Sequence, residues 1–424
     1  MTFFFDFVFL LFLLLATPKA IKRRLSNPDY KGMFIKRFYC GRFKSSVSHP
    51  TIWLNGVSVG EVVSLSPLVK QYEKHYPGIQ LVISVTTGTG YKRAKALYPN
   101  HFVIAYPFDF SFIVRFFLNR IQPSLFISAE LDLWPNFLTA CKSKGIPYVV
   151  VSGRISERSV KGYERIRFLF ADALNSITKF MAQDKIDAER ASRMGLTQDK
   201  VSVQGNLKFD LIDVSEKEIP EKLNHFFNQN SKTFVSSSTH DPEEKWIADM
   251  FSSDSMIKCF DEWRWIMVPR HPERAQSLKK MLEQKGFEVV LYSELEHQSF
   301  SSKTVLLVDQ IGVLPLLYQR CDLCYMGGSL IPHGSQNMIE PAAWGIPVFL
   351  GPSLHTFREA SDFLIKNDAV IRIDNMQDFE KKLQQLLENL DERVNIGTRA
   401  KDTILKQRGV SQRIFNTLET LLKG

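Results

Sequence analysis

Cysteine is scarce in this chain, with five residues among 424. So few thiols form no disulfide framework. Cys321 and Cys324 make a single C-x-x-C motif, but they lie inside an apparent strand, with no second cysteine pair and no paired histidine nearby. A structural zinc site needs about four ligands of this kind. We therefore expect buried core thiols at these positions and no bound metal.

Long basic runs and the common nucleotide motifs are also missing. The formal net charge of +9 and the pI near 9.1 favour a partner that carries phosphates, either nucleic acid or an anionic lipid. The Lys and Arg residues are spread along the chain without an Arg-rich tail, so we expect no nucleic-acid partner. The turn at residues 86–90 (TTGTG) fits neither the P-loop nor the G-x-G-x-x-G pattern. Nucleoside triphosphate hydrolysis and dinucleotide binding therefore lose support.

A long hydrophobic run is present only at the N-terminus, and it is short for a membrane span. Residues 2–16 are almost wholly Phe, Leu and Val, whereas a span needs ~17–25 residues. The basic residues Lys19, Lys22, Arg23 and Arg24 follow the run, while a secretory signal carries its charge in front. This order predicts an N-terminal anchor with the rest of the protein on the cytoplasmic side. The anchor either spans the bilayer or lies in its interface, and a cleaved signal peptide is the alternative.

The remainder of the chain alternates between short apolar runs and longer amphipathic stretches, which is typical of parallel sheets with helices on both faces. The predicted strands are 51–55, 80–85, 101–105, 124–128, 147–151, 179–182, 201–204, 233–237, 264–268, 287–291, 304–308, 322–326, 347–350 and 369–373. Helical patterns are clearest at 62–75, 111–120 and 134–143.

A polar stretch at residues 213–232 separates two series of strands and marks a domain boundary near 210–230. The sequence therefore predicts an α/β protein with an anchor and basic flank at 1–24 and two Rossmann-like domains at 25–212 and 213–424. The last roughly 45 residues are predicted to be helical.

Segment 57–61 is the most informative part of the first domain. An apolar strand ends at small residues, Gly60 permits a tight turn, and Glu61 follows where an amphipathic helix begins. Open α/β sheets place their ligands at such strand ends. An ionised carboxylate beside a cleft can act as a general base, although a glutamate here also complements the helix dipole.

Two further strand ends of the first domain carry charged residues. Segment 130–136 begins with Glu130 and includes Pro135, which suits the first turn of a helix. Two carboxylates on adjacent strand ends can divide the roles of base and hydrogen-bond partner, while a cap and a solvated acid is the alternative. Lys208 follows the last strand, where it can meet a phosphate or simply lie on the surface.

The second domain has polar and glycine-rich strand ends. Residues 241–244 suggest a capping box with Asp241 as N-cap and Glu244 at N3. Arg270 and His271 follow a strand on a rigid loop, and Arg suits bidentate phosphate binding. Glycine-rich turns at 327–329 and from 334 precede a short helix, and Glu340 can accept hydrogen bonds from a ribose. Together these strand ends predict a nucleotide site.

These segments together resemble the Kdo transferases (3-deoxy-D-manno-octulosonic acid transferases), the lipopolysaccharide enzymes of Gram-negative bacteria. Two of the most specific matches read GRISERS at 153–159 and VPRHPER at 268–274. The matching segments run in family order over nearly all of the chain at 57–61, 86–90, 130–136, 153–159, 205–210, 238–240, 268–274, 327–329 and 337–341.

The resemblance implies a GT-B glycosyltransferase, with two Rossmann-like domains facing across a cleft and an N-terminal membrane anchor. Such an enzyme moves Kdo from CMP-Kdo to a hydroxyl of the lipid A precursor (lipid IVA) with inversion, and needs no metal or other cofactor. It implies a location at the bacterial inner membrane, with the catalytic part on the cytoplasmic face.

The resemblance also assigns roles to residues. It implies that Glu61 is the catalytic base, and that Glu130 and Lys208 stabilise the transition state. The positions that match the family's CMP contacts are Pro269, Arg270, Ile311, Gly312, Val313, Asn337, Met338, Ile339 and Glu340.

Some positions depart from the family pattern. The usual Met-Gly-Glu-Leu reads Ile311-Gly312-Val313-Leu314, so a glutamate is replaced by Val313. The usual Gly-Gly-His-Asn run begins at Gly334 and has Ser335 and Gln336 in its middle, and an Asn of a later loop is Thr356. These changes lie in the donor domain, where they alter the expected contacts with CMP.

Two other classes of function remain open. One is a GT-B enzyme that uses a UDP-sugar, which binding of CMP but not UDP would exclude. The other is a membrane-anchored binding protein without catalysis, against which the intact Glu61 argues.

Overall fold

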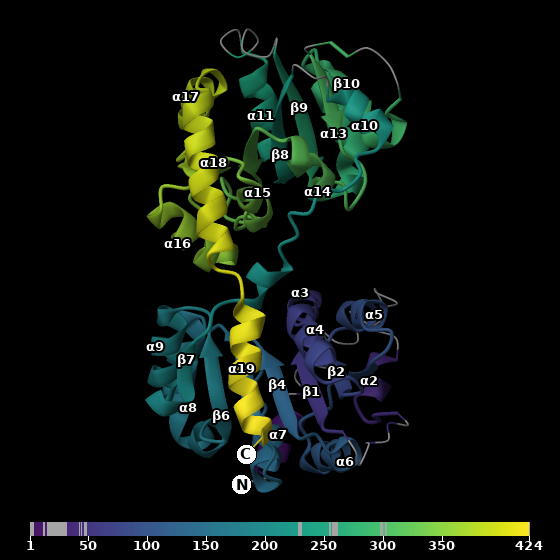
Figure 1. The fold of residues 1–424 in the computed structure, drawn as a ribbon, viewed down its shortest axis with the longest axis vertical. Helices are drawn as coiled ribbons and strands as arrows, with labels where there is room; N and C mark the ends of the chain where they lie inside the picture. The colour runs from purple at the N-terminus through teal and green to yellow at the C-terminus, as the bar shows by residue number, and fades with distance from the viewer. Residues whose placement is uncertain are drawn as a thin grey trace. The chain divides into compact units, whose positions relative to one another are not determined.

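The computed structural model describes residues 4–11, 13, 14, 32–41, 43, 45, 49–227, 231–253, 256, 262–296, 300, 301 and 303–423. They form two compact units (Figure 1). Unit 1 comprises Met1–Leu211 together with Gly409–Gly424, and unit 2 comprises Ile212–Arg408. The expected assignment of residues 213–424 to a single domain is therefore wrong at its end, because the last helix belongs to unit 1.

Unit 1 is built on a seven-stranded sheet whose described strand pairs are all parallel, in the order β3-β2-β1-β4-β5-β6-β7. Its strands are β1 (Thr51–Gly56), β2 (Gln80–Val85), β3 (Phe102–Ala105), β4 (Leu125–Ala129), β5 (Tyr148–Gly153), β6 (Ile177–Ala182) and β7 (Val201–Val203). The helices of unit 1 include α2 (Met33–Lys36), α3 (Val59–Ser64), α4 (Ser66–His75), α5 (Gly88–Leu97), α6 (Ser111–Ile121), α7 (Pro135–Ser143), α8 (Glu157–Leu174), α9 (Lys185–Met194) and α19 (Val410–Lys423), with 3₁₀ turns η2 (Gln198–Lys200) and η3 (Leu207–Leu211).

Unit 2 repeats this architecture with a seven-stranded sheet of parallel described pairs, in the order β10-β11-β9-β8-β12-β13-β14. Its strands are β8 (Lys232–Thr239), β9 (Trp263–Pro269), β10 (Glu288–Leu291), β11 (Thr304–Leu307), β12 (Leu323–Met326), β13 (Val348–Leu350) and β14 (Ile371–Arg372). Its helices include α10 (Glu221–Phe226), α11 (Glu243–Phe251), α13 (Ala275–Gln284), α14 (Leu314–Leu317), α15 (Ile339–Trp344), α16 (Arg358–Lys366), α17 (Met376–Glu388) and α18 (Leu390–Leu405), with 3₁₀ turns η5 (Pro272–Arg274), η6 (Tyr292–Glu294), η7 (Tyr318–Arg320) and η8 (His355–Phe357). Every strand range predicted from the sequence overlaps an observed strand, and the two parallel sheets confirm the predicted α/β class with two Rossmann-like domains.

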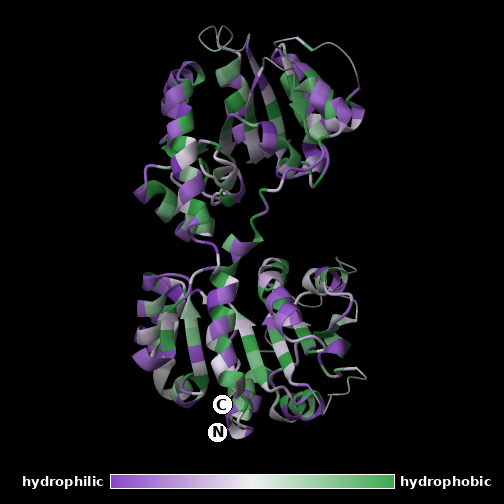
Figure 2. Ribbon diagram, in the orientation of Figure 1, coloured by the Kyte–Doolittle hydropathy of each residue, from purple (hydrophilic) through white to green (hydrophobic). Residues whose placement is uncertain are grey.

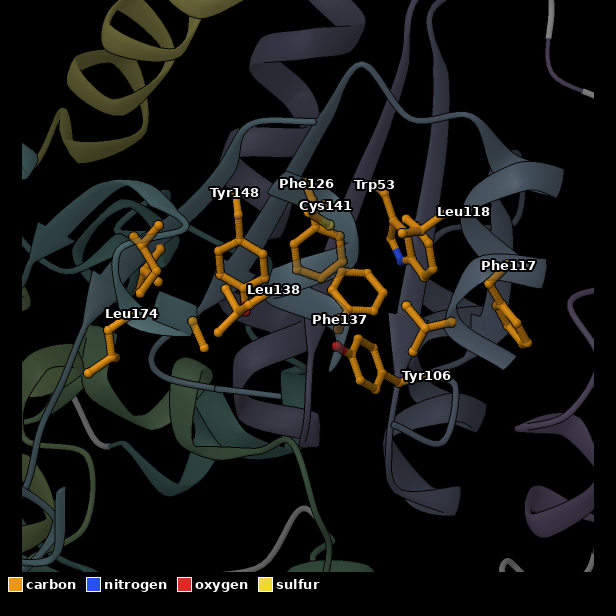
Figure 3. Packing of buried hydrophobic residues seen from close by; sticks show 14 of the residues in the cluster. Trp53, Tyr106, Phe117, Leu118, Phe126, Phe137, Leu138, Cys141, Tyr148 and Leu174 are labelled. Carbon is orange, nitrogen blue, oxygen red and sulfur yellow. The ribbon is translucent and has the colours of Figure 1, made fainter. Parts of the chain in front are cut away.

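Each sheet has a hydrophobic core on both faces. In unit 1, Trp53 and Phe126 enter one core while their strand neighbours Leu54 and Ile127 enter the other, because successive side chains of a strand point to opposite faces. Figure 3 shows the aromatic side of the first core, around Phe137. Strands buried on both faces are rich in apolar residues, and the strands of Figure 2 accordingly carry green segments among white and purple ones. This is why they could be recognised as short continuous apolar runs.

The last helix, α19, is held to unit 1 by its apolar face and by its first turn. Ile414 and Leu418 are fully buried in the core that contains Leu54. At the start of the helix the Asp210 carboxylate accepts hydrogen bonds from the backbone N–H groups of Gly409 (2.7 Å) and Ser411 (2.6 Å). Asp210 thereby satisfies donors that have no partner inside the helix.

The start of the chain also packs on unit 1. Residues 4–11, 13 and 14 are helical, and Phe9 belongs to the core around Trp53. The Asp6 carboxylate accepts hydrogen bonds from the Ser111 backbone N–H and hydroxyl, both at 2.7 Å, and from the Asn136 amide at 3.1 Å. In the described part of the chain, no helix is both long and apolar enough to cross a membrane. The predicted basic flank, Lys19 to Arg24, lies outside the described residues.

One predicted helix, 62–75, is divided into α3 and α4. Pro67 occupies the first turn of α4 and has no N–H to donate to the carbonyl of Val63, four residues earlier. The hydroxyl of Ser66 donates to that carbonyl instead, at 2.8 Å. The prediction missed this break because apolar residues continue across it at helical spacing.

Candidate active site

The strand order of unit 1 reverses between β1 and β4, which pair directly in the sheet. Parallel α/β sheets bind ligands at the carboxyl ends of the strands beside such a reversal, where the loops diverge to opposite faces. Glu61 follows β1 and Glu130 follows β4. The two carboxylates predicted to be functional therefore flank the reversal point of unit 1.

Glu61 lies in the first turn of α3, after the N-cap residue Ser58. Its Oε2 accepts a hydrogen bond from the Val57 backbone N–H (2.7 Å), and its Oε1 accepts one from the Ser58 hydroxyl (2.9 Å). These bonds fix the orientation of the carboxylate and also connect it to the start of the helix. The same geometry is therefore compatible with a helix-capping role and with a role as a base.

Burial is the main reason that the pKa of Glu61 is raised to about 7. The hydrogen bonds from Val57 and Ser58 oppose this rise in pKa, while the negative charges of Glu130 and Asp132 add to it. A base works best when its pKa lies near the working pH. Glu61 is therefore able to accept a proton at neutral pH, which an ordinary exposed glutamate does poorly.

Glu130 and Lys208 form an ion pair, with the Lys208 ammonium 2.9 Å from Glu130 Oε1. Their side chains are 24% and 31% exposed, so both remain reachable from solvent. Glu130 has a positive φ of 57°, an uncommon conformation for a residue with a side chain. The backbone of η3 next to Lys208 is fixed by a hydrogen bond from Leu207 N–H to the Ser152 hydroxyl (3.0 Å). Strand ends of β4, β5 and β7 thus combine to position the pair.

A series of hydrogen bonds between largely buried polar side chains leads from Trp53 to Asp132, and the sequence did not reveal it. The Trp53 indole donates to Ser84 (2.9 Å), Ser84 donates to Asn55 (2.7 Å), and Asn55 donates to the Asp132 carboxylate (3.0 Å). Burial raises the pKa of Asp132 to about 6, against the hydrogen bond from Asn55. This series of hydrogen bonds links β2, β1 and the segment after β4. It therefore depends on pairing between these strands, which no local sequence pattern encodes.

The strand order of unit 2 reverses between β8 and β12, which also pair directly. His240 follows β8, and the glycine-rich segment from Gly327 follows β12. Gly327 packs so closely on the end of β8 that an added Cβ would lie 2.3 Å from the Ser238 carbonyl oxygen. Arg270, after β9, donates its backbone N–H to the Thr239 carbonyl (2.9 Å), and its side chain is exposed.

The predicted CMP contacts fall on both sides of this reversal. Asn337 donates from its amide to Glu340 Oε1 (2.8 Å) and accepts from the Ile339 N–H (3.1 Å). Burial raises the pKa of Glu340, while its hydrogen bond with Asn337 lowers it. The side chains of Met338 and Ile339 are buried, so only their backbone groups can face a ligand. Of the segment after β11, Ile311 is 91% exposed, Gly312 has a φ of 91°, and Val313 is buried.

The predicted capping box at residues 241–244 is wrong. The helix α11 begins at Glu243, without a side-chain cap, and Asp241 points to solvent 3.8 Å from Arg274. The nearby Glu243 is buried instead and accepts the backbone N–H groups of His240 (3.0 Å) and Gly328 (2.8 Å). Burial raises the pKa of Glu243, and these hydrogen bonds oppose the rise. This carboxylate, which the sequence reasoning missed as a site residue, joins the two loops at the reversal point.

Among the described residues, no set of three or more His, Cys, Asp or Glu side chains is arranged to hold a metal ion. Cys321 and Cys324 are both free thiols, and Cys324 is buried. Burial raises the pKa of both thiols, which makes them poor metal ligands.

Residues 34–211 match the family model described as 3-deoxy-D-manno-octulosonic-acid transferase (kdotransferase). A relative from Haemophilus influenzae, named 3-deoxy-D-manno-octulosonic acid transferase, is 29% identical over 94% of this chain and 93% of its own length. A bifunctional glycosyltransferase/methyltransferase from Fusobacterium nucleatum is 31% identical over 85% of this chain and 57% of its own length.

Among solved structures, the UDP-GlcNAc 2-epimerase from Neisseria meningitidis bound to UDP-GlcNAc superposes with a TM-score of 0.60. The match covers 88% of this chain and 100% of that chain at 13% identity. At so low an identity the likeness concerns the two-unit α/β fold alone.

Proposed function

The chain belongs to the family of 3-deoxy-D-manno-octulosonic acid (Kdo) transferases and is a glycosyltransferase, and we propose that it moves Kdo from CMP-Kdo to a hydroxyl of the lipid A precursor in lipopolysaccharide biosynthesis. The observation that carries this proposal is the position and pKa of Glu61. It is a carboxylate with a pKa of about 7 at the reversal point of unit 1, held by Val57 and Ser58. A transferase that inverts needs one base of this kind on the acceptor side.

In the proposed reaction, Glu61 takes the proton from the acceptor hydroxyl. The oxygen then forms a bond to the anomeric carbon of Kdo, on the face opposite to CMP. The bond between that carbon and the phosphate oxygen breaks, and CMP leaves with the electron pair. The configuration at the anomeric carbon is therefore inverted.

The leaving phosphate needs positive charge as it departs. We assign transition-state stabilisation to Lys208 and Glu130, which form one ion pair, and CMP binding to Pro269, Arg270 and the segments 311–313 and 337–340. The hydrogen bond between Asn337 and Glu340 supports the assignment because it orients two polar side chains on the loop that carries four of these positions. Val313 supplies no carboxylate where the family has one, so Glu340 is the acidic group that we assign to the nucleotide.

We further propose that the chain attaches to the cytoplasmic face of the inner membrane through its N-terminal segment. The exposed apolar side chains of Phe7, Leu10 and Leu14 support the proposal, as does the basic run that follows them in the sequence. Attachment would keep the enzyme beside a phosphorylated lipid acceptor, and its net charge of +9 favours an anionic surface.

The proposed donor and acceptor are tested by incubating the protein with CMP-Kdo, generated in situ, and a radiolabelled lipid A precursor. Product should form, and CMP should inhibit its formation while UDP should not. Transfer of a sugar from a UDP-sugar, and not from CMP-Kdo, would overturn the assignment of the donor. A folded chain that binds CMP and transfers nothing would favour the binding-protein alternative, or another acceptor.

A further inference from the structure

Three histidine rings meet at the reversal point of unit 2. His240 follows β8, His271 follows β9, and His333 lies in the loop after β12. The ring centroids of His240 and His333 are 4.1 Å apart, and those of His240 and His271 are 5.9 Å apart. His240 is only 8% exposed, whereas His271 and His333 are exposed. Only the segments that carry His240 and His271 were singled out by the sequence reasoning.

Gln336 is the hydrogen-bond partner of His240. Its Nε2 lies 3.3 Å from His240 Nε2. An amide nitrogen only donates, so in this orientation the imidazole nitrogen accepts and carries no proton. Turning the amide over would present its oxygen to a protonated nitrogen at the same place. Gln336, one of the departures from the family pattern, therefore suits both protonation states of His240.

Positive groups surround His240 on the side of β9 and β12. Burial is the main cause that lowers the pKa of His240 to about 4. The charges of His333, His271, Arg270 and Arg274 lower this pKa further. At neutral pH His240 is therefore uncharged unless something compensates these charges.

The acidic groups nearby are already engaged. The Glu243 carboxylate accepts a hydrogen bond from the backbone N–H of His240, and the Glu244 carboxylate forms an ion pair with Arg274 at 2.8 Å. Asp241 lies 3.8 Å from Arg274, and Glu273 lies 3.2 Å from His271. Within the described residues, these four carboxylates have partners other than the rings of His240 and His333. The cluster is thus suited to a negatively charged ligand.

We infer that His240, His271 and His333 form a proton-coupled anion site, which binds the phosphate or the sugar carboxylate of the nucleotide donor and takes up a proton on binding. The inference rests on the proposed function. Two charged imidazoles 4.1 Å apart repel each other, and a bound anion offsets this repulsion. Anion binding consequently raises the proton affinity of His240, and by linkage the anion binds more weakly as the pH rises.

The inference is tested by NMR titration of the full chain with isotope-labelled histidine, with and without CMP. The resonance of His240 is identified with His240→Gln. Without ligand the pKa of His240 should lie near 4. With saturating CMP it should rise by about two units, as expected when an anion meets a partly buried imidazole. His225, whose ring contacts Phe300, serves as the internal control and should not shift.

Three ligands distinguish whether the phosphate or the sugar carboxylate of the donor is the anion that binds at the histidine cluster. Cytidine has no anionic group and should leave the pKa of His240 unchanged. CMP tests the phosphate and free Kdo tests the carboxylate, and the one that raises this pKa identifies the group. If CMP binds but neither anion moves the pKa of His240, the inference is overturned while the donor assignment survives. If CMP does not bind at all, both fall.

A variant of the second ring provides an independent readout. His333→Asn should weaken CMP binding by up to about tenfold near pH 5 and hardly at all near pH 8, because a His240 pKa that rises from about 4 to about 6 strengthens binding about tenfold at pH 5 and negligibly at pH 8. The same substitution at His225 should leave both affinities unchanged. An equal loss at both pH values would indicate a packing role for His333 and contradict proton coupling.

Discussion

The carboxylate of Glu61 is controlled by opposing effects within a few ångströms. Burial raises its pKa to about 7, while the hydrogen bonds from Val57 and Ser58 favour the charged form and hold it in one orientation. The same two hydrogen bonds would also be found if Glu61 only stabilised the start of the helix. The pH dependence of the transfer rate distinguishes a catalytic base from such a structural role.

We predict that the rate of sugar transfer rises with pH through an apparent pKa near 7. The carboxylate accepts a proton only when it is ionised, and the pKa of Glu61 is about 7. The rate should be measured as kcat/KM against pH, because this parameter reports groups of the free enzyme. A limb near 4.5, the ordinary value for a glutamate, would contradict the assignment.

The raised pKa of Glu61 also has a consequence for stability. Its folded-state pKa of about 7 lies above the usual 4.5, so the folded chain binds this proton more tightly than the unfolded chain. The stability that results is present at low pH and is lost as the pH rises through about 7. Glu61→Gln should therefore be about 1–2 kcal/mol more stable than the wild type near pH 8, and no more stable near pH 4.

This stability difference is measured by urea denaturation at the two pH values. Glu262→Gln is a suitable control, since that side chain is 72% exposed. A loss of stability on Glu61→Gln near pH 8 would mean that helix capping outweighs the cost of burying the charge.

The ion pair between Lys208 and Glu130 should act as one unit. Lys208→Met and Glu130→Gln should each lower kcat by about 10²–10³, the usual cost of removing one group that stabilises a transition state. The double variant should lose little more than either single variant, because each substitution already breaks the 2.9 Å contact. Additive losses in kcat would show that the two residues act separately.

Local residue patterns could reveal Glu61, Glu130 and Lys208, because each follows a recognisable strand. They could not reveal the series of hydrogen bonds from Trp53 to Asp132 or the role of Glu243. Those groups meet only through pairing between strands that are distant in the sequence. Asp241 has the residue type and spacing of a helix cap, but the buried Glu243 takes the neighbouring backbone donors instead.

At the scale of elements, helix α19 illustrates what periodicity can predict. Its apolar spacing predicts a helix, and the helix is found. The pattern does not say which sheet the apolar face covers. Asp210, which lies about two hundred positions earlier, accepts the N–H groups at the start of the helix and so adds a polar contact that holds it on unit 1.

We predict that Asp210→Ala destabilises unit 1 by about 1–2 kcal/mol, the usual cost of losing a helix cap. Hydrogen exchange of α19 should increase in this variant, because the first turn loses its acceptor. Asp213→Ala is the matched control, since Asp213 bonds only locally, to Ser215 and Lys217, in the described structure. Equal effects of the two substitutions would contradict the anchoring role of Asp210.

At the scale of the whole molecule, the two units share one design. Each sheet reverses its strand order once, between β1 and β4 in unit 1 and between β8 and β12 in unit 2. The proposed base lies beside the first reversal, and the histidine cluster lies beside the second. The alternation of strands and helices predicted two parallel sheets. The order of the strands follows from the crossovers, which periodicity does not encode, so the reversal points emerged only from the structure.

The most direct test of the central claim compares Kdo transfer by the wild type and by Glu61→Gln near pH 8, with CMP affinity measured on the same preparations. Loss of a general base should lower the transfer rate by about 10²–10⁴ while CMP affinity stays within about twofold. Gln keeps the shape of the side chain, so the helix start should survive. Transfer by Glu61→Gln at the wild-type rate would contradict the assignment of Glu61 as the base.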